Sequence, residues 1–410
     1  MTDKLSQIRA DLPAVQHKAF LNSGWYGPLP RPALEAIEQD ARDQLETGRP
    51  VMRRIERVRE ASAGLRQDFA ALFNVPLESV ALTHHTTDGM NIVTQGFNWQ
   101  PGDEVATTTI EHEAGIYPLY VLNHRYGVKI NFADVGLGAD PLPAIEAALT
   151  PRTRLLVLSH VSYSSGARLP LEEILTLAHD RGIPVLVDGA QSAGVFALDL
   201  TALNVDFYAI PGQKWLCGPE GVGMLYVRPD HIATLHPTYT NFFTVASHDW
   251  HGEYQLNSTA VKFETGTIYP GVLTGMRASL RWFNETVGPD WAYSRIAHIA
   301  AYTRARIAAL DGVRIITPEH RQASLVNFLP VGWSAAQMAG LAAELDRRGY
   351  VIRSISHEPF AVRVSCGFFN TEAEIDGLVA ELADVLRAGP DSVTIPDWAV
   401  QFNVPSHPVY

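Results

Sequence analysis

One lysine of this chain stands where a chemical role would place it. The stretch AIPGQKWLCGPEGVG, residues 209–223, carries Lys214 among small and apolar residues, directly after the strand-like run VDFYAI. Glycines follow at positions 218, 221 and 223. Ligands of open α/β sheets bind at the carboxyl ends of the strands. Lys214 is therefore a candidate reactive amine, although a lysine by itself could equally be an ion-pair partner.

Further polar residues follow neighbouring strand-like runs in the same way. Thr86 and Thr87 open a predicted helix, where their side chains and the first amides could hold an anion. Later strand ends supply His112, Tyr163, Asp188, Gln191 and Gln213. Each residue alone has an ordinary explanation, such as a helix cap for Thr87 or Asp188. Their placement at successive strand ends favours one shared site.

This set of residues meets the requirements of pyridoxal 5′-phosphate (PLP). That cofactor needs a lysine for a Schiff base and a partner for its pyridine nitrogen, together with a phosphate cradle. Lys214 would supply the amine, and Asp188 would keep the ring nitrogen protonated. His112 would lie on the ring face, and Gln191 would reach the phenolic oxygen. We predict Lys214, His112 and Asp188 as the catalytic groups.

Other classes of function are disfavoured. The chain has no GxxxxGK[ST] loop and no GxGxxG after a strand. Its two cysteines, Cys217 and Cys366, lack metal-ligand spacing, and EHE at 111–113 is too compact for a zinc helix, so no metal is predicted. A net charge of −12 disfavours nucleic acids and anionic membranes. The chain shows no signal peptide and no membrane-spanning run, so we expect a cytoplasmic protein.

The elements that must position these residues indicate an α/β fold. Near-continuous apolar strands alternate with helical periods from about residue 80 to residue 227, which predicts a mostly parallel, seven-stranded sheet covered on both faces. Residues 236–270 read as irregular. After them SLVNFLPV, YVIRSI and AVRVSC alternate with helices near 335–348 and 371–388, which predicts a smaller α+β domain.

These patterns divide the chain into four parts. An N-terminal segment, 1–25, is expected to pack on the small domain. The large PLP-binding domain spans 26–275 and the small α+β domain spans 276–390. The tail, 391–410, has no clear period and reads as an extended surface segment.

The motif VDGAQSAG, followed by GQKWLCGPEGVGMLYV, resembles the class V aminotransferase family of fold-type-I PLP enzymes. The resemblance runs from FLNSGWYGPLP to VRVSCGFFNTEAEID, nearly the whole chain. The family includes cysteine desulfurases, cystine C–S lyases and isopenicillin N epimerases. KWLCGPEGVG and SHVSYSSGARLPLEEI are most similar to the C–S lyases, and KWLC also recurs in the epimerase branch.

The resemblance implies a role for each matching position. Lys214 forms the Schiff base, and Thr87 with the amide of Thr86 binds phosphate. Thr267, in FETGT, reaches the phosphate of a neighbouring subunit, which implies a homodimer with composite sites. Arg363 clamps the α-carboxylate of an amino-acid substrate with help from Arg353. Apart from the resemblance, Tyr163 and the stretch NSGWYGP, which holds Asn22 and Trp25, are candidate walls of the substrate pocket, although NSGWYGP could equally serve domain packing.

Three positions depart from the family pattern. Gln213 stands where many members have histidine before the lysine, so a phosphate ligand is either lost or replaced by the Gln213 amide. Tyr163 stands where desulfurases often have asparagine. The loop SISHEPFA between Arg353 and Arg363 lacks the nucleophilic cysteine of desulfurases, and a packing role is expected for Cys366 and Cys217.

These observations predict a PLP-dependent C–S lyase that performs β-elimination on cysteine, cystine or a cysteine S-conjugate. The expected products are pyruvate, ammonia and a sulfur compound. Two alternatives stay open. One is an epimerase, an aminotransferase or a natural-product tailoring enzyme of the same family, which would share the removal of the Cα proton. The other is a protein of this fold without catalysis, which the intact Lys214, Asp188 and Arg363 disfavour.

Overall fold

The computed structural model describes residues 2–266 and 268–399. Within them a seven-stranded sheet runs in the order β2-β8-β7-β6-β5-β3-β4. Its strands are β2 (Val80–Thr83), β3 (Glu104–Thr108), β4 (Lys129–Ala133), β5 (Thr153–Ser159), β6 (Val185–Asp188), β7 (Phe207–Pro211) and β8 (Gly223–Val227). Only β8 pairs antiparallel with its neighbours in this sheet. The predicted α/β fold with a mostly parallel seven-stranded sheet is confirmed.

The strands bury both of their faces, as their apolar sequences require. On β7, Phe207 and Ala209 pack with α4 (Thr86–Gly96) and α5 (Glu113–Tyr126). The alternate residues Tyr208 and Ile210 belong to the core on the opposite face. This period of two places a hydrophobic layer on each side of the sheet. The large unit, as we call the sheet and its helices, is therefore a three-layer structure.

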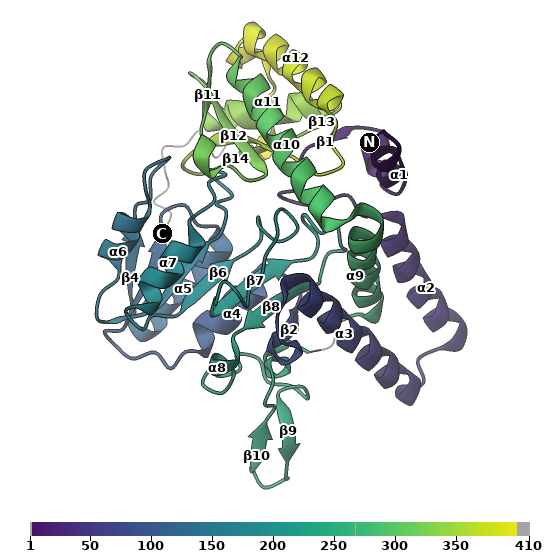
Figure 1. Cartoon of the computed structure of the whole chain (residues 1–410), viewed down its shortest axis with the longest axis vertical. Helices are drawn as coiled ribbons and strands as arrows, with labels where there is room; N and C mark the ends of the chain where they lie inside the picture. The colour runs from purple at the N-terminus through teal and green to yellow at the C-terminus, as the bar shows by residue number, and fades with distance from the viewer. Residues whose placement is uncertain (1, 267, 400–410) are drawn as a thin grey trace.

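The helices of the large unit cover both faces of its sheet. The opposite core layer draws on α3 (Val51–Phe73), α7 (Leu171–His179) and α9 (Pro270–Trp282). Before α3, α2 (Arg31–Thr47) ends at Gly48, whose φ of 69° suits glycine. Figure 1 shows α2, α3 and α9 together on one flank. The shorter helices are α1 (Thr2–Ala10), α6 (Leu142–Ala148) and α8 (Pro229–Ile232).

A second body, here called the small unit, lies above the sheet in Figure 1. Its antiparallel sheet has the order β11-β12-β15-β14. These strands are β11 (Val313–Ile315), β12 (Leu325–Pro330), β14 (Arg353–Ile355) and β15 (Ala361–Ser365), and its helices are α10 (Pro289–Ala308), α11 (Ala335–Arg347) and α12 (Glu372–Ala388). Near the N-terminus, β1 (Ala19–Phe20) pairs in parallel with β13 (Tyr350–Val351).

Three local expectations were wrong. The stretch 236–270 contains a hairpin, β9 (Val245–His248) with β10 (Tyr254–Leu256), which projects from the body in Figure 1. YVIRSI forms two strands instead of one, because β13 pairs with β1 and β14 pairs with β15. The described part of the tail is not simply superficial, since Val393 packs into the core of the small unit. Residues 400–410 lie outside the described residues.

None of the helices in the described part of the chain combines the length and the apolarity needed to cross a bilayer.

Candidate active site

A cavity of about 180 Å³ opens at the carboxyl edge of the large sheet. The loops after β2, β3, β5, β6 and β7 supply most of its wall, and residues near the N-terminus close it. Nine of the predicted site residues line it: Trp25, Thr86, Thr87, His112, Tyr163, Asp188, Gln191, Gln213 and Lys214. The residues at these strand ends are thus gathered in one place, as expected for this edge of a parallel sheet.

Lys214 reaches this wall because the chain turns tightly after β7. The amide of Gly212 donates to the oxygen of Val222 (2.9 Å), and a Cβ on Gly212 would lie 2.6 Å from the sulfur of Met276. Desolvation lowers the pKa of Lys214 to about 8, helped by the positive charges of Arg363 and Arg353 and opposed by Asp188. A sizeable fraction of this amine is therefore neutral and nucleophilic near pH 8.

Asp188 ends β6 with its carboxylate held at the cavity. Its Oδ1 accepts a hydrogen bond from the amide of Ala190 (2.8 Å), and the residue is 5% exposed. Gln191 is anchored on both sides. Its Nε2 donates to the oxygen of Gly24 (2.9 Å) and its Oε1 accepts from Trp215 (3.0 Å). The second Nε2 hydrogen is the donor that Gln191 can still offer to a ligand.

His112 caps the N-terminus of α5 and faces the cavity. Its Nδ1 accepts a hydrogen bond from the amide of Ala114 (3.0 Å), which fixes the ring. Desolvation, followed by the charge of Lys214, lowers the pKa of His112. The ring is therefore neutral at pH 7 and carries its proton on Nε2. Tyr163 packs edge-on against it, with ring centroids 4.6 Å apart.

The residues present fit a phosphorylated pyridine cofactor. Thr86 and Thr87 begin α4 and line the cavity, so the first turn of this helix, a favourable position for an anion, borders the cavity. Oγ1 of Thr86 and Oε1 of Gln213 are buried with no hydrogen-bond partner within the described structure. Unpaired buried polar atoms are costly. A phosphate at the start of α4 would supply an acceptor for the Thr86 hydroxyl.

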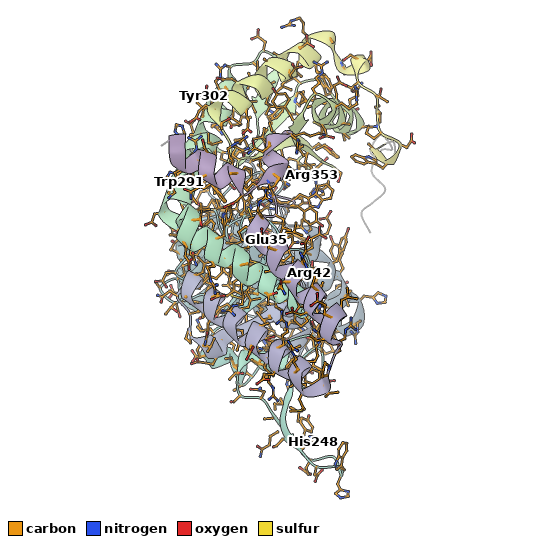
Figure 2. The ribbon with its side chains drawn as sticks, turned by 90° about the vertical axis from the view of Figure 1, so that its right-hand side faces the viewer. Glu35, Arg42, His248, Trp291, Tyr302 and Arg353 are labelled. Atoms are coloured by element: carbon orange, nitrogen blue, oxygen red, sulfur yellow. The ribbon has the colours of Figure 1, made fainter. Side chains whose placement is uncertain are left out.

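The two predicted substrate arginines lie just outside this lining. Arg363 is fully buried. Its Nη2 and the Oε1 of Gln191 both lie close to Gly24, because a Cβ added to this glycine would be 3.1 Å from each of the two atoms. Arg353 stacks on the ring of Trp25 at 4.6 Å. In Figure 2 it lies where the small unit meets the larger body. Asn22 is 7% exposed, and its Oδ1 is likewise unpaired.

Thr267 lies outside the described residues. Its predicted contact with the phosphate of a neighbouring subunit stays a prediction.

Two acidic residues beside His112 were missed by sequence reasoning. Glu111, 8% exposed, accepts hydrogen bonds from Thr108 (2.5 Å) and Ser159 (2.6 Å). Burial, with a contribution from the charge of Asp188, raises its pKa to about 7. Glu113 follows on α5. The run EHE was weighed only as a metal motif, although its position at a strand end could have drawn attention to both glutamates. Glu111 contacts Ser159 and Glu113 contacts Tyr163, and both partners line the cavity. Among the described residues, no group of three or more His, Cys, Asp or Glu side chains could hold a metal.

Both cysteines are free thiols buried in the hydrophobic core. Cys217 is 1% and Cys366 is 0% exposed. Burial raises the pKa of the Cys217 thiol, and it raises the pKa of Cys366 to about 12. Cys366 donates a weak hydrogen bond to Thr303 (3.4 Å). Buried thiols with raised pKa values are poor nucleophiles.

Comparison with known proteins agrees with this geometry. Residues 27–378 match the family model described as Aminotransferase class-V. The chain belongs to the class-V aminotransferase family. It is 30% identical over 344 residues to a probable cysteine desulfurase of Xylella fastidiosa, covering 80% of this chain and 81% of that protein. It is 29% identical over 398 residues to the cysteine desulfurase CsdA of Escherichia coli K12, covering 91% of this chain and 96% of that protein.

Solved structures of this class-V family extend the comparison. The cystine C–S lyase C-DES, in complex with its reaction product cysteine persulfide, matches with a TM-score of 0.86 and 31% identity over 91% of this chain and 99% of that one. A mutant of C-DES, with glycine covalently linked to its PLP cofactor, gives the same TM-score. The predicted family, its fold type and its cofactor class, PLP, are confirmed.

Proposed function

We propose that this class-V enzyme is a PLP-dependent lyase that cleaves the C–S bond of cysteine, cystine or a cysteine S-conjugate by β-elimination. One observation carries the choice of lyase over desulfurase. The loop between Arg353 and Arg363 reads SISHEPFA and holds no thiol, while Cys217 and Cys366 are buried. A persulfide-forming step needs an accessible thiolate. Two free thiols also suit the cytoplasm, which we propose as the location.

In this reaction, Lys214, Asp188 and Arg363 would each have a separate role. Lys214 would hold PLP until the substrate amine takes its place, and the cofactor would supply an electron sink for the pair left at Cα when the Cα–H bond breaks. The Lys214 amine, with its lowered pKa, would accept that proton. Asp188 would hold a proton on the pyridine nitrogen. Arg363 would bind the α-carboxylate through the donors that have no partner in the protein.

The overall reaction balances without an oxidant or reductant. The Cα–H and Cβ–S bonds break, and one water molecule supplies the keto oxygen of pyruvate while the nitrogen leaves as ammonia. From cysteine the sulfur leaves as hydrogen sulfide. From cystine the second half leaves as cysteine persulfide, because the S–S bond is not broken.

We also propose a homodimer with shared active sites. The start of α3 and the loop before β9 expose apolar side chains that no other element covers, Met52 at 75% and Phe242 at 69%. Beside Phe242 lies a cavity of about 510 Å³, whose wall also contains Arg54, Ile55, Val58, Arg59 and Phe243. Exposed apolar patches of this kind mark interaction surfaces, and a second copy of the chain is the partner that the predicted role of Thr267 requires.

The proposed reaction is tested by a product screen. The holoenzyme is incubated with cysteine, cystine and S-substituted cysteines, and the keto acid and sulfur products are identified by mass spectrometry. Pyruvate in equal amount to ammonia supports β-elimination. An amino acid that exchanges its Cα proton with heavy water, or is converted to its own keto acid with no loss of sulfur, would indicate an epimerase or an aminotransferase instead.

A further inference from the structure

Glu113 places a carboxylate at the mouth of the candidate site. Its Oε2 accepts a hydrogen bond from the hydroxyl of Tyr163 (3.3 Å) and lies 3.4 Å from Nε2 of His112. Its Oε1 lies 3.7 Å from Nε2 of His357, which belongs to the loop after β14 in the small unit. The Glu113 side chain is 40% exposed. The carboxylate thus contacts two residues of the cavity lining, His112 and Tyr163, and stays partly exposed to solvent.

The charges around the mouth form an ordered pattern. Arg353, stacked on Trp25, is near enough that the charge of Glu113 counteracts the lowering of its pKa by burial. The two charges also act in opposite directions on the pKa of His112. Arg353 and Glu113 therefore form a positive and a negative group at the entrance, while Arg363 and Lys214 provide the positive charges further in.

We propose that Glu113 is a specificity-determining residue that binds a cationic group carried by the substrate beyond the C–S bond that breaks. The inference rests on the proposed lyase function and narrows its substrate class. Cysteine has no group in that position. Cystine carries a second α-ammonium there, at the far side of its disulfide, and a cationic S-conjugate would do the same. Glu113 takes no part in bond making.

The competing explanation is purely local. Glu113 is in the first turn of α5, where a negative charge stabilises the helix and helps to orient His112. Such a role would affect all substrates equally. A direct role in recognition would affect only substrates with a distal cation.

The experiment uses three mixed disulfides of cysteine that share the reactive half and differ in the distal half. The partners are cysteamine, which carries an ammonium, 3-mercaptopropionate, which carries a carboxylate, and 2-mercaptoethanol, which is neutral. The kcat/KM for pyruvate release is measured for the wild-type holoenzyme and for Glu113→Gln. Glu172→Gln, which removes a charge from the first turn of α7, is the matched control.

We expect the wild type to prefer the cysteamine disulfide over the mercaptopropionate disulfide. Glu113→Gln should lower kcat/KM about fivefold for the cysteamine disulfide, through KM, as for a partly exposed ion pair. In Glu113→Gln, kcat/KM for the neutral disulfide should change less than twofold. Glu172→Gln should leave kcat/KM unchanged for all three disulfides. An equal loss for all three disulfides in Glu113→Gln, or no loss, would overturn the inference.

Failure of the lyase proposal would be recognised separately. No pyruvate from any disulfide would count against the proposed function. Calorimetric titration of the same three compounds into the holoenzyme would then decide the role of Glu113. A preference for the cysteamine disulfide that disappears in Glu113→Gln supports it, and equal affinities in both proteins contradict it.

Discussion

The guanidinium of Arg363, on β15 of the small unit, donates a hydrogen bond to the backbone oxygen of Tyr163, which follows β5 of the large unit (3.3 Å). The contact joins the two units beside the cavity. Nε and Nη2 of the same guanidinium are buried without a hydrogen-bond partner in the described structure. A buried charge with unpaired donors is costly. A bound carboxylate would remove that cost, which is why we assign Arg363 to the substrate.

Arg363→Lys should impair substrate binding although it keeps the charge. A lysine cannot offer two parallel donors to a carboxylate, so we expect kcat/KM to fall about 10- to 100-fold. Arg306→Lys, in an exposed ion pair with Asp376, is the control and should have no effect. Steady-state kinetics with cystine checks this, and an Arg363→Lys enzyme within threefold of wild type would remove Arg363 from substrate binding.

Lys214 should take up PLP at a lower pH than an ordinary lysine. Its neutral form is the nucleophile, and its pKa is lowered to about 8 by desolvation. The rate of PLP incorporation into the apoenzyme should therefore rise up to about pH 8 and then level off. Removing a neighbouring positive charge by Arg353→Met should move this inflection to higher pH. A rate that keeps rising to pH 10 in the wild type would show that Lys214 is not desolvated.

Glu111 should make the apoenzyme less stable as the pH rises toward neutrality. Its pKa is raised from 4.5 to about 7, mainly by burial. Between these values the folded state binds the proton that the unfolded state releases. The contribution of Glu111 to the free energy of unfolding is therefore complete below pH 4.5, and it is lost as the pH rises through 7.

The comparison with Glu111→Gln isolates this effect, because glutamine does not titrate. From pH 5 to pH 8, the stability of wild type relative to Glu111→Gln should fall by on the order of 3 kcal/mol. Glu104→Gln is the control. Hydrogen bonding, chiefly from Asn131, lowers the pKa of Glu104 to about 2, so its contribution stays constant over this range. Denaturant unfolding at several pH values measures both, and parallel curves for wild type and Glu111→Gln would contradict the prediction.

The enzyme should sediment as a dimer at assay concentration. Phe242→Asp should weaken the dimer, because this side chain is 69% exposed in the single chain and lies beside Ile55 and Val58 of α3. If the sites are shared, PLP affinity should fall together with the dimer fraction. Tyr254 pairs with His248 on the hairpin, and Figure 2 shows His248 on the projecting arm. The variant Tyr254→Asp tests whether that arm also contributes to the dimer. A fully active monomer would contradict the composite site.

The site was largely readable from the sequence because it lies at the strand ends. Apolar strands locate the sheet edge, so the residues after each strand, such as Asp188 and Lys214, must meet there. The role of Glu113 could not be read in the same way. Its contact with His357 joins two units far apart in the chain, and only the packing of the small unit brings them together.

The hairpin β9–β10 was not predicted from the sequence, for a different reason. Its side chains are mostly exposed, so no alternation of buried and exposed residues marks it as strand. The division of YVIRSI at Ile352 was missed because the apolar pattern of this stretch continues through it. Strands β13 and β14 are separate only because they pair with different strands, β1 and β15.

In the proposed reaction, sulfur leaves without passing through a thiol of the enzyme. The most direct measurement is product analysis of the Cys217→Ala/Cys366→Ala double variant with cysteine and with cystine, after circular dichroism has shown that it folds. We expect the variant to retain C–S cleavage and to release pyruvate, because both thiols are buried and neither lines the cavity. Alanine as the main product of the wild type, together with loss of cleavage in the variant, would contradict it and would indicate a desulfurase.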